Sequence, residues 1–188
     1  MTIKSDRWIR KMALEQEMIT PFEEGIKRPG KISYGLSSYG YDIRLANEFK
    51  IMKEPVYTDL KVLDPKECTE NLFYDFEGDT CLVPPNSFVL ARSLEYIRVP
   101  RDVMVICMGK STWARQGLVL NTTPLENSWC GNITLELSNT TPYPIRVYAN
   151  EGIGQLLFFQ SDEISESSYA DKQGKYQDQK TIVMSRVD

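Results

Sequence analysis

The sequence predicts a mainly β fold with one short helix near its N-terminus. Short apolar or alternating runs follow one another from residue 37 onward. Turn residues separate them, as at Pro84-Pro85-Asn86 and Asn150-Glu151-Gly152. Many short strands with regular turn signals are typical of an antiparallel sandwich or jelly roll. The sequence shows no strand–helix–strand alternation and no internal repeat, so we do not expect a parallel α/β sheet.

The expected strands are short. Tyr41, Ile43 and Leu45 alternate with polar residues, which is the pattern of a strand with one buried face. An aromatic-rich run and further apolar runs complete the set. The expected strands lie at residues 41–45, 71–76, 88–91, 103–108, 118–121, 133–137, 145–148 and 153–160.

The helix is expected to begin at Ser5, whose side chain can cap it, while Asp6 suits its first turn. Apolar residues then recur at helical spacing. They are Trp8, Ile9, Met12 and Ala13. We expect the helix to end near Thr20-Pro21, because the residue before a proline avoids the helical region. Residues 23–30 are expected to form a loop.

Length and composition indicate one domain, spanning residues 1–188. The chain has 26% charged and 41% hydrophobic residues, which is ordinary for a soluble globular protein. The sequence has no run of about 18 apolar residues, so we expect no helix that spans a membrane. Residues 1–6 lack the order of a secretory signal, so we expect a cytoplasmic protein without membrane partners.

The net charge of -4 argues against a nucleic acid polymer as partner, because such binding needs a broad basic surface. A few lysine and arginine residues gathered in a cleft can still hold a small anion. Residues 161–188 are polar, and their composition predicts a mobile tail. Tyr169 and Tyr176 within it indicate that the tail orders over another part of the molecule for part of the time.

The chain contains no histidine, which excludes every triad, acid–base pair or metal site that needs imidazole. The four cysteines form no C-x-x-C pair, so the zinc deaminase pattern is missing. We therefore expect no zinc or other metal site on the chain, and reduced, buried cysteines. The cysteines are Cys68, Cys81, Cys107 and Cys130.

Residues 109–117, GKSTWARQG, follow an apolar strand. Ser111 can cap a short helix that Gly117 ends, and the N-terminus of such a helix offers backbone N–H groups to an anion. Lys110 and Arg115 add charge. The match to a P-loop fails, because its first glycine would fall at Met104. A surface turn with solvated cations would show the same pattern.

Residues 132–138, NITLELS, predict a strand with Ile133, Leu135 and Leu137 on one face. Thr134 and Glu136 then share the other face. In a pocket, partial desolvation would raise the pKa of Glu136 toward the range of a general base. The alternative is a solvent-facing glutamate on a half-exposed strand.

Gln155 lies within a run that is apolar on both faces and is expected to be buried. A buried glutamine needs hydrogen-bond partners. The sequence leaves open whether Gln155 bonds to the backbone or to a ligand.

Taken together, these segments resemble the dCTP deaminase family of the dUTPase-like superfamily. The resemblance is strongest at residues 110–115, KSTWAR, and 134–141, TLELSNTT. It extends to residues 37–42, to 84–88 and to the tail at 169–179. Each motif alone is weak, whereas their order and spacing together are highly specific.

The resemblance implies a distorted jelly-roll or β-barrel of the dUTPase-like type. It implies a homotrimer with active sites between subunits, and a tail, residues 161–188, that closes over the nucleotide. The implied reaction is hydrolytic deamination of dCTP to dUTP and ammonia, which supplies dUTP for thymidylate synthesis. Mg²⁺ would accompany the triphosphate without taking part in deamination, and dTTP is a common inhibitor in the family.

The resemblance also assigns roles by position. Glu136 matches the catalytic glutamate, and Ser111 and Arg115 match residues that place the water and support the reacting base. Residues 110–115 match the phosphate-binding segment, which includes Lys110, Thr112, Trp113 and Ala114, and Thr134 and Leu135 match positions that flank the cytosine. Further matching positions are expected to contact the nucleotide, the last three of them from the closing tail; they are Gln155, Tyr169, Lys175 and Gln179. Glu126 falls where the family often has an aspartate near the sugar, in a shorter loop than in some members.

Two other functions are compatible with this scaffold. A bifunctional enzyme or a dUTP pyrophosphatase would go on to dUMP. Trimeric dUTPases activate water with an aspartate in a loop near this position, whereas this chain has Glu126 there in a shortened loop, which disfavours that alternative. A non-catalytic nucleotide-binding module would not need Glu136, Arg115 and the tail motif together.

Overall fold

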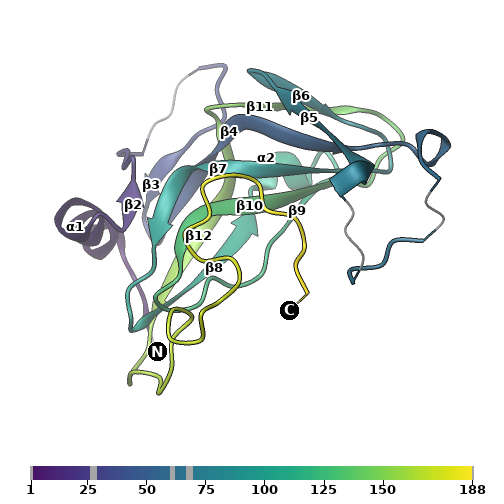
Figure 1. Cartoon of the computed structure of the whole chain (residues 1–188). Helices are drawn as coiled ribbons and strands as arrows, with labels where there is room; N and C mark the ends of the chain where they lie inside the picture. Colours follow the sequence, from purple (N-terminus) through teal and green to yellow (C-terminus); the bar gives the residue numbers. More distant parts are fainter. Residues whose placement is uncertain (1, 26–28, 60–61, 67–69, 188) are drawn as a thin grey trace.

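Two antiparallel sheets form the body of the computed structural model, which describes residues 2–25, 29–59, 62–66 and 70–187 (Figure 1). The strands of the described residues are β1 (Thr2–Ile3), β2 (Ile19–Thr20), β3 (Gly35–Ser37), β4 (Gly40–Met52), β5 (Phe73–Glu77), β6 (Thr80–Val83), β7 (Phe88–Arg98), β8 (Val103–Gly109), β9 (Leu118–Asn121), β10 (Cys130–Asn139), β11 (Ile145–Tyr148) and β12 (Gly152–Gln160). The helices are α1 (Asp6–Gln16) and α2 (Ser111–Ala114), with 3₁₀ turns η1 (Pro55–Tyr57) and η2 (Glu70–Leu72).

The larger sheet runs in the order β1-β12-β4-β7-β10-β9, and β8 adds to β12. Strands β11 and β6 form a separate pair. Neighbours in the sheet are mostly distant in sequence, as in a jelly roll. The prediction of a mainly β, distorted jelly-roll fold with a short N-terminal helix is confirmed.

Strands β9 and β11 have the bounds that the sequence predicts, whereas β4 and β7 are longer. Strand β4 continues through polar residues to Met52. Its pairing with β7 changes register between Leu45 and Phe49 and then resumes. Such an irregularity lets one strand bend from one part of a sheet into another. Hydrophobic alternation therefore located the strands but not their full length.

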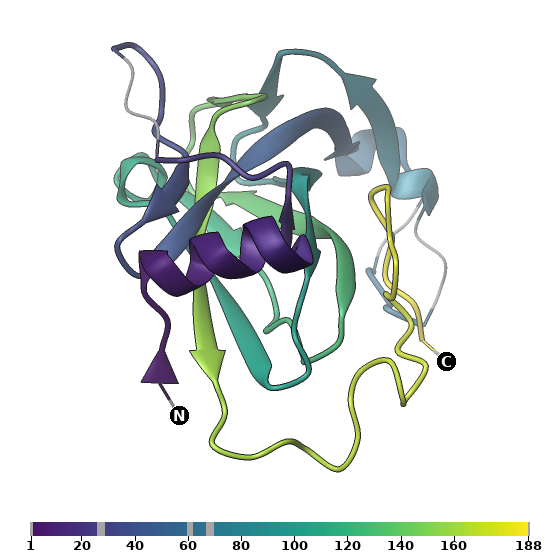
Figure 2. The same ribbon diagram turned by 90° about the vertical axis from the view of Figure 1, so that its left-hand side faces the viewer.

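Helix α1 lies at one side of the sheet (Figures 1 and 2). Ile9 and Ala13 are buried, and the Trp8 ring packs 6.3 Å from that of Phe158. Ser5 stands at the N-cap, but its side chain makes no capping hydrogen bond. The expected end near residue 20 is wrong, because the helix ends at Gln16 and Glu17 takes the left-handed conformation. The chain then forms β2, which pairs with β7.

A buried ion pair joins β4 and β7. The Nε of Arg44 donates to Glu95 at 2.7 Å, and the Arg44 backbone N–H donates to the other carboxylate oxygen at 2.9 Å. Both side chains are almost entirely buried. Burial raises the pKa of Glu95, and the hydrogen bonds and charge of Arg44 oppose that shift.

Residues 161–187 are anchored to the body at several points, although their composition predicts a mobile tail. The Tyr169 ring packs against the core, Ser168 is buried, and Ile182 joins a second apolar cluster. Figure 1 shows this yellow segment crossing in front of β7 and β10. Few apolar side chains are needed for anchoring, so average composition underestimates it.

Within the described ranges, no helix is long and apolar enough to cross a membrane. Cys81 and Cys107 are buried and Cys130 is half-buried, and all three are free thiols. Cys68 and residues 26–28 of the expected loop lie outside the described residues.

Candidate active site

Strand β10 positions Glu136. Ile133, Leu135 and Leu137 turn into the core with at most 3% exposure, so Thr134 and Glu136 face the other way. The predicted alternation is therefore confirmed. Glu136 lies opposite Leu90 of β7 and Asn121 of β9, which places it on an inner strand of the sheet.

The Glu136 carboxyl is largely withdrawn from water. Its Oε2 is buried and has no hydrogen-bond partner in the part of the chain that the structure describes. Burial raises the pKa of Glu136 to about 7, and a hydrogen bond from its own backbone opposes that shift. A carboxyl with this pKa exchanges protons readily in both directions near neutral pH, as a general acid–base requires.

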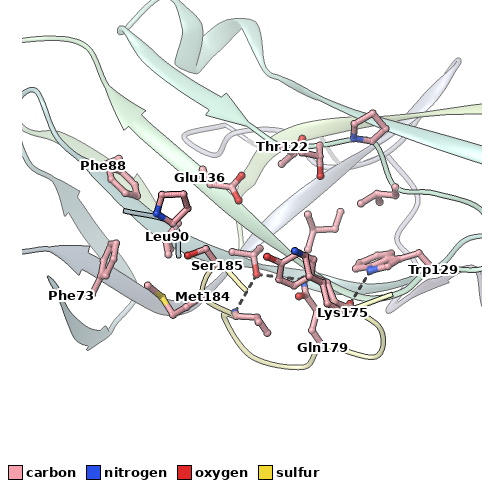
Figure 3. Close-up of a pocket in the computed structure, with 18 of the residues that line it drawn as sticks. Phe73, Phe88, Leu90, Thr122, Trp129, Glu136, Lys175, Gln179, Met184 and Ser185 are labelled. Carbon is pink, nitrogen blue, oxygen red and sulfur yellow. Dashed lines mark hydrogen bonds between the residues drawn. The ribbon is translucent and has the colours of Figure 1, made fainter. Parts of the chain in front are cut away.

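Glu136 opens into a cavity of about 750 Å³, a size within the range of small-molecule sites. Figure 3 shows Glu136 between an apolar end, marked by Phe73, Phe88 and Leu90, and the tail residues Lys175 and Gln179. The loop that follows β9 supplies a third wall. Its lining residues are Thr122, Thr123, Pro124, Leu125 and Glu126.

The tail forms one side of this cavity. Trp129 Nε1 donates to the backbone oxygen of Tyr176 at 2.9 Å. Gln179 Nε2 donates to the Asn132 carbonyl at 2.7 Å and to Thr134 Oγ1 at 3.4 Å. Gln179 also pairs with Gly131 in an isolated β-bridge. These bonds tie the tail to the start of β10, close to Glu136.

Two buried acceptors face the cavity. Gln179 Oε1, like Glu136 Oε2, has no partner among the described residues. Buried polar atoms are nearly always hydrogen-bonded in folded proteins. The pair therefore suits a ligand that brings its own N–H or O–H donors.

Six predicted site residues line this cavity. They are Glu126, Thr134, Glu136, Tyr169, Lys175 and Gln179. Leu135 is also on β10, but its side chain is fully buried in the core. The Glu126 carboxylate lies 3.6 Å from Lys172, and both side chains are half-exposed.

The other predicted residues do not line the cavity of this chain. Lys110 forms an ion pair with Asp42. Gln155 Nε2 donates to the same carboxylate at 3.1 Å and to Ser37 Oγ at 3.0 Å. Gln155 thus bonds to two side chains, whereas the sequence left open only the backbone or a ligand.

Helix α2 carries the rest of the 110–115 motif. Trp113 is buried and its Nε1 donates to the Gly152 carbonyl at 2.9 Å. Its neighbours in the motif are exposed; they are Ser111, Thr112, Ala114 and Arg115. Lys110 occupies the N-cap, so the expectation that Ser111 caps this helix is wrong by one position. Gly117 follows with a positive φ of 78°, as a helix-ending glycine does.

Sequence reasoning missed several lining residues. Tyr176 adjoins the predicted Lys175 and Trp129 lies three residues after Glu126, but the pairing of a tryptophan N–H with the tail leaves no sequence signal. Asp42, the partner of Lys110 and Gln155 outside the cavity, had a signal, since it is an acidic residue on a strand whose neighbours are apolar. The apolar end of the cavity, from Phe73 to Leu90, carries no pattern that separates it from ordinary core.

Comparison with known proteins places this geometry in a family. Residues 3–161 match the family model described as dCTP deaminase-like. The chain is 57% identical over 187 residues to a dCTP deaminase of Campylobacter hominis, covering 100% of this chain and 97% of that protein. It is 58% identical over 187 residues to a dCTP deaminase of Acidobacterium capsulatum, covering 100% of both.

A solved structure, the 2'-deoxycytidine 5'-triphosphate deaminase from Agrobacterium tumefaciens, shares the fold with a TM-score of 0.60 at 16% identity. The match covers 83% of this chain and 47% of that one. The family model spans most of the chain, and the full-length relatives agree in more than half of their residues. The chain belongs to the dCTP deaminase-like family.

Proposed function

We propose that this protein hydrolyses dCTP to dUTP and ammonia, with Glu136 as general acid–base. The observation that carries the proposal is the partly desolvated Glu136 carboxyl, with a pKa of about 7, in a cavity that the tail borders. The full-length relatives named dCTP deaminase support the substrate. The product dUTP would serve thymidylate synthesis.

In the proposed mechanism, Glu136 takes a proton from a bound water, and the resulting hydroxide attacks C4 of cytosine. The same carboxyl delivers that proton to N3, then takes the proton of the new C4 hydroxyl and passes it to the amino group, so that the C4–N bond breaks and ammonia leaves. Water and dCTP are thereby converted to dUTP and ammonia with all atoms accounted for. General acid–base assistance of this kind contributes roughly a hundred- to ten-thousand-fold to the rate.

The substrate would be the Mg²⁺ complex of dCTP, and the ion would remain with the phosphates. Lys175 offers a cation at the cavity. The chemistry uses no zinc in this proposal, which is supported by the lack of histidine and of a C-x-x-C pair in the sequence. A chelator selective for zinc should leave turnover unchanged.

We place the site between subunits of a homotrimer. Ser111 on α2 and Arg115 at its C-cap are exposed and lie outside the cavity of their own chain. A neighbouring subunit could bring them to Glu136, where they would hold the water and the base. Residues 161–188 would close over the nucleotide, dTTP would compete at the same site, and the enzyme would act in the cytoplasm.

Product analysis tests the proposal. The purified protein is incubated with dCTP and Mg²⁺, with and without a zinc chelator, and the nucleotides and ammonia are measured. Equal amounts of dUTP and ammonia are expected. Formation of dUMP and pyrophosphate would instead assign the bifunctional reaction, and tight binding of dCTP without turnover would assign a non-catalytic module.

The role of Glu136 has its own test. Glu136→Gln should abolish ammonia release while calorimetry still detects dCTP binding, and exposed Glu54→Gln is the matched control. Near-normal turnover by Glu136→Gln would refute the mechanism.

A further inference from the structure

Lys175 is the tail cation that borders the cavity. Its Nζ donates to the backbone oxygen of Arg186 and lies 5.6 Å from the centre of the Tyr176 ring. No carboxylate of the described residues forms an ion pair with it. Within the part of the chain that the structure describes, no carboxylate therefore competes with an anion for the remaining donors of the ammonium, but a lysine side chain is flexible and must be held to use them well.

Arg186 also forms hydrogen bonds to residues 175 and 176 of the tail. Its Nη1 donates to the Lys175 carbonyl at 3.0 Å, and its backbone N–H donates to the Tyr176 hydroxyl at 3.1 Å. Together with the bond from Lys175, these contacts form a closed ring of three hydrogen bonds. We call residues 175, 176 and 186 the tail clasp.

The segment that leads to Arg186 is anchored beside Glu136. Ile182 is buried against Phe73 and Leu90, and the Val183 backbone N–H donates to Thr134 Oγ1 at 3.3 Å. Met184 and Ser185 then line the cavity (Figure 3). Arg186 is itself exposed, so its guanidinium is available to the tail without a cost of burial.

We propose that Arg186 is a positioning residue for the substrate's phosphates and acts through Lys175. The guanidinium fixes the backbone of residue 175, and the Arg186 carbonyl orients the ammonium toward the triphosphate. The clasp thereby presents a cation that the flexible tail alone would leave in many orientations. This inference rests on the proposed function, since it assigns the phosphates of that substrate to this edge of the cavity.

A double-mutant cycle separates positioning from other roles. Arg186→Ala should raise KM for Mg-dCTP about five- to tenfold and change kcat by less than about twofold, because it removes only the guanidinium bond to the Lys175 carbonyl, while the two clasp bonds to the backbone of residue 186 remain. Lys175→Met should raise KM about a hundredfold, since a charged contact to phosphate is removed. Adding Arg186→Ala to Lys175→Met should raise KM by no more than about twofold further.

Two more variants complete the design. Arg186→Lys keeps the charge but not the forked geometry, and it should raise KM about two- to threefold. Lys180→Ala removes a tail cation outside the clasp, and its KM should stay unchanged. An unchanged KM for Arg186→Ala, a fall in kcat alone, or an equal penalty in the Lys175→Met background would each overturn the role.

The inference can fail independently of the proposed function. The same cycle is measured as Kd for Mg-dCTP in the Glu136→Gln background, where turnover does not contribute. Wild-type protein that binds dCTP but releases no ammonia would contradict the function while the cycle still tests the clasp. A purely structural role for Arg186 would lower the melting temperature and would leave the coupling to Lys175 at zero.

Discussion

The Glu136 carboxyl is poorly hydrated in the folded protein, and ionising it there destabilises the folded state. Its pKa rises from 4.5 to about 7 on folding, so the folded protein binds more protons than the unfolded chain between these values. Stability from this group is therefore full below pH 4.5 and falls as pH rises toward 7. An uncharged isostere escapes this loss.

We expect Glu136→Gln to stabilise the ligand-free protein by about 1–3 kcal/mol at pH 8, after discounting for the part of the carboxyl that solvent screens. The gain should vanish well below pH 4.5, where the wild-type carboxyl is protonated in both states. Urea denaturation at the two pH values measures it. Glu54→Gln, on an exposed residue, should show no such dependence.

The same pKa sets the pH dependence of catalysis. If Glu136 must be ionised in the free enzyme to activate water, kcat/KM should fall tenfold per pH unit below about pH 7. Steady-state rates from pH 5 to 9 give this profile. An acid limb centred near pH 4.5 would show that the carboxyl is solvated in the working enzyme.

Sequence reasoning succeeded at this scale where a side chain's face depends on alternation alone. Glu136 and Thr134 face the cavity because successive side chains of a strand point to opposite faces, and their neighbours point into the core. It could not find that Asp42 takes both Lys110 and Gln155 as partners, because those residues come from three distant segments. Only the folded sheet brings such partners together.

At the scale of elements, the indole N–H of Trp129, just before β10, is one of several hydrogen bonds that hold the tail to the body. Trp129→Phe keeps the ring and removes the bond to the Tyr176 carbonyl. We expect a loss of about 1 kcal/mol in tail docking and a three- to tenfold rise in KM for dCTP. Faster proteolysis within the tail, with an unchanged core melting temperature, checks where the loss occurs.

The ion pair between β4 and β7 gives a second prediction for elements. Glu95→Ala leaves the Arg44 guanidinium buried without its carboxylate, which should cost about 3–5 kcal/mol of unfolding free energy. Asp75→Ala, which breaks the exposed pair with Lys50, should cost less than about 1 kcal/mol. Denaturant titration of both variants compares them. Equal losses would mean that the Arg44–Glu95 pair is solvated.

Element positions were largely predictable and element ends were not. The two outcomes differ at α1, whose buried face follows from the spacing of Ile9 and Ala13. Its end was placed too late, because the chain turns at Glu17 to pair β2 with β7, and the sequence does not show that pairing. The anchored tail was missed for a similar reason, since Ile182 finds its apolar partners on three other segments.

At the scale of the whole molecule, the 110–115 motif and the Glu136 cavity belong to different regions of one chain. The sequence resemblance joined them in one catalytic unit. The proposed trimer reconciles the two observations, because a heterologous ring places different surfaces of two copies against each other. The exposed Ser111 and Arg115 of one copy would then serve the Glu136 of the next.

Subunit mixing tests this arrangement. Glu136→Gln and Arg115→Ala should each be inactive as pure proteins. When they are refolded together in equal amounts, a site is intact only if its glutamate and its arginine come from the right copies, with a chance of one half each. The mixture should then recover about a quarter of the wild-type activity.

A site contained within one chain predicts a different result, since every copy in the mixture would carry one defect and no activity would return. Mixing Glu136→Gln with Gln179→Ala supplies the internal control. Both of these residues line the cavity of a single chain, so a mixture of the two variants can build an intact site only if the tail exchanges between copies. Recovery in the first mixture without recovery in the second would locate Arg115 on the neighbouring subunit and Gln179 on the subunit of Glu136.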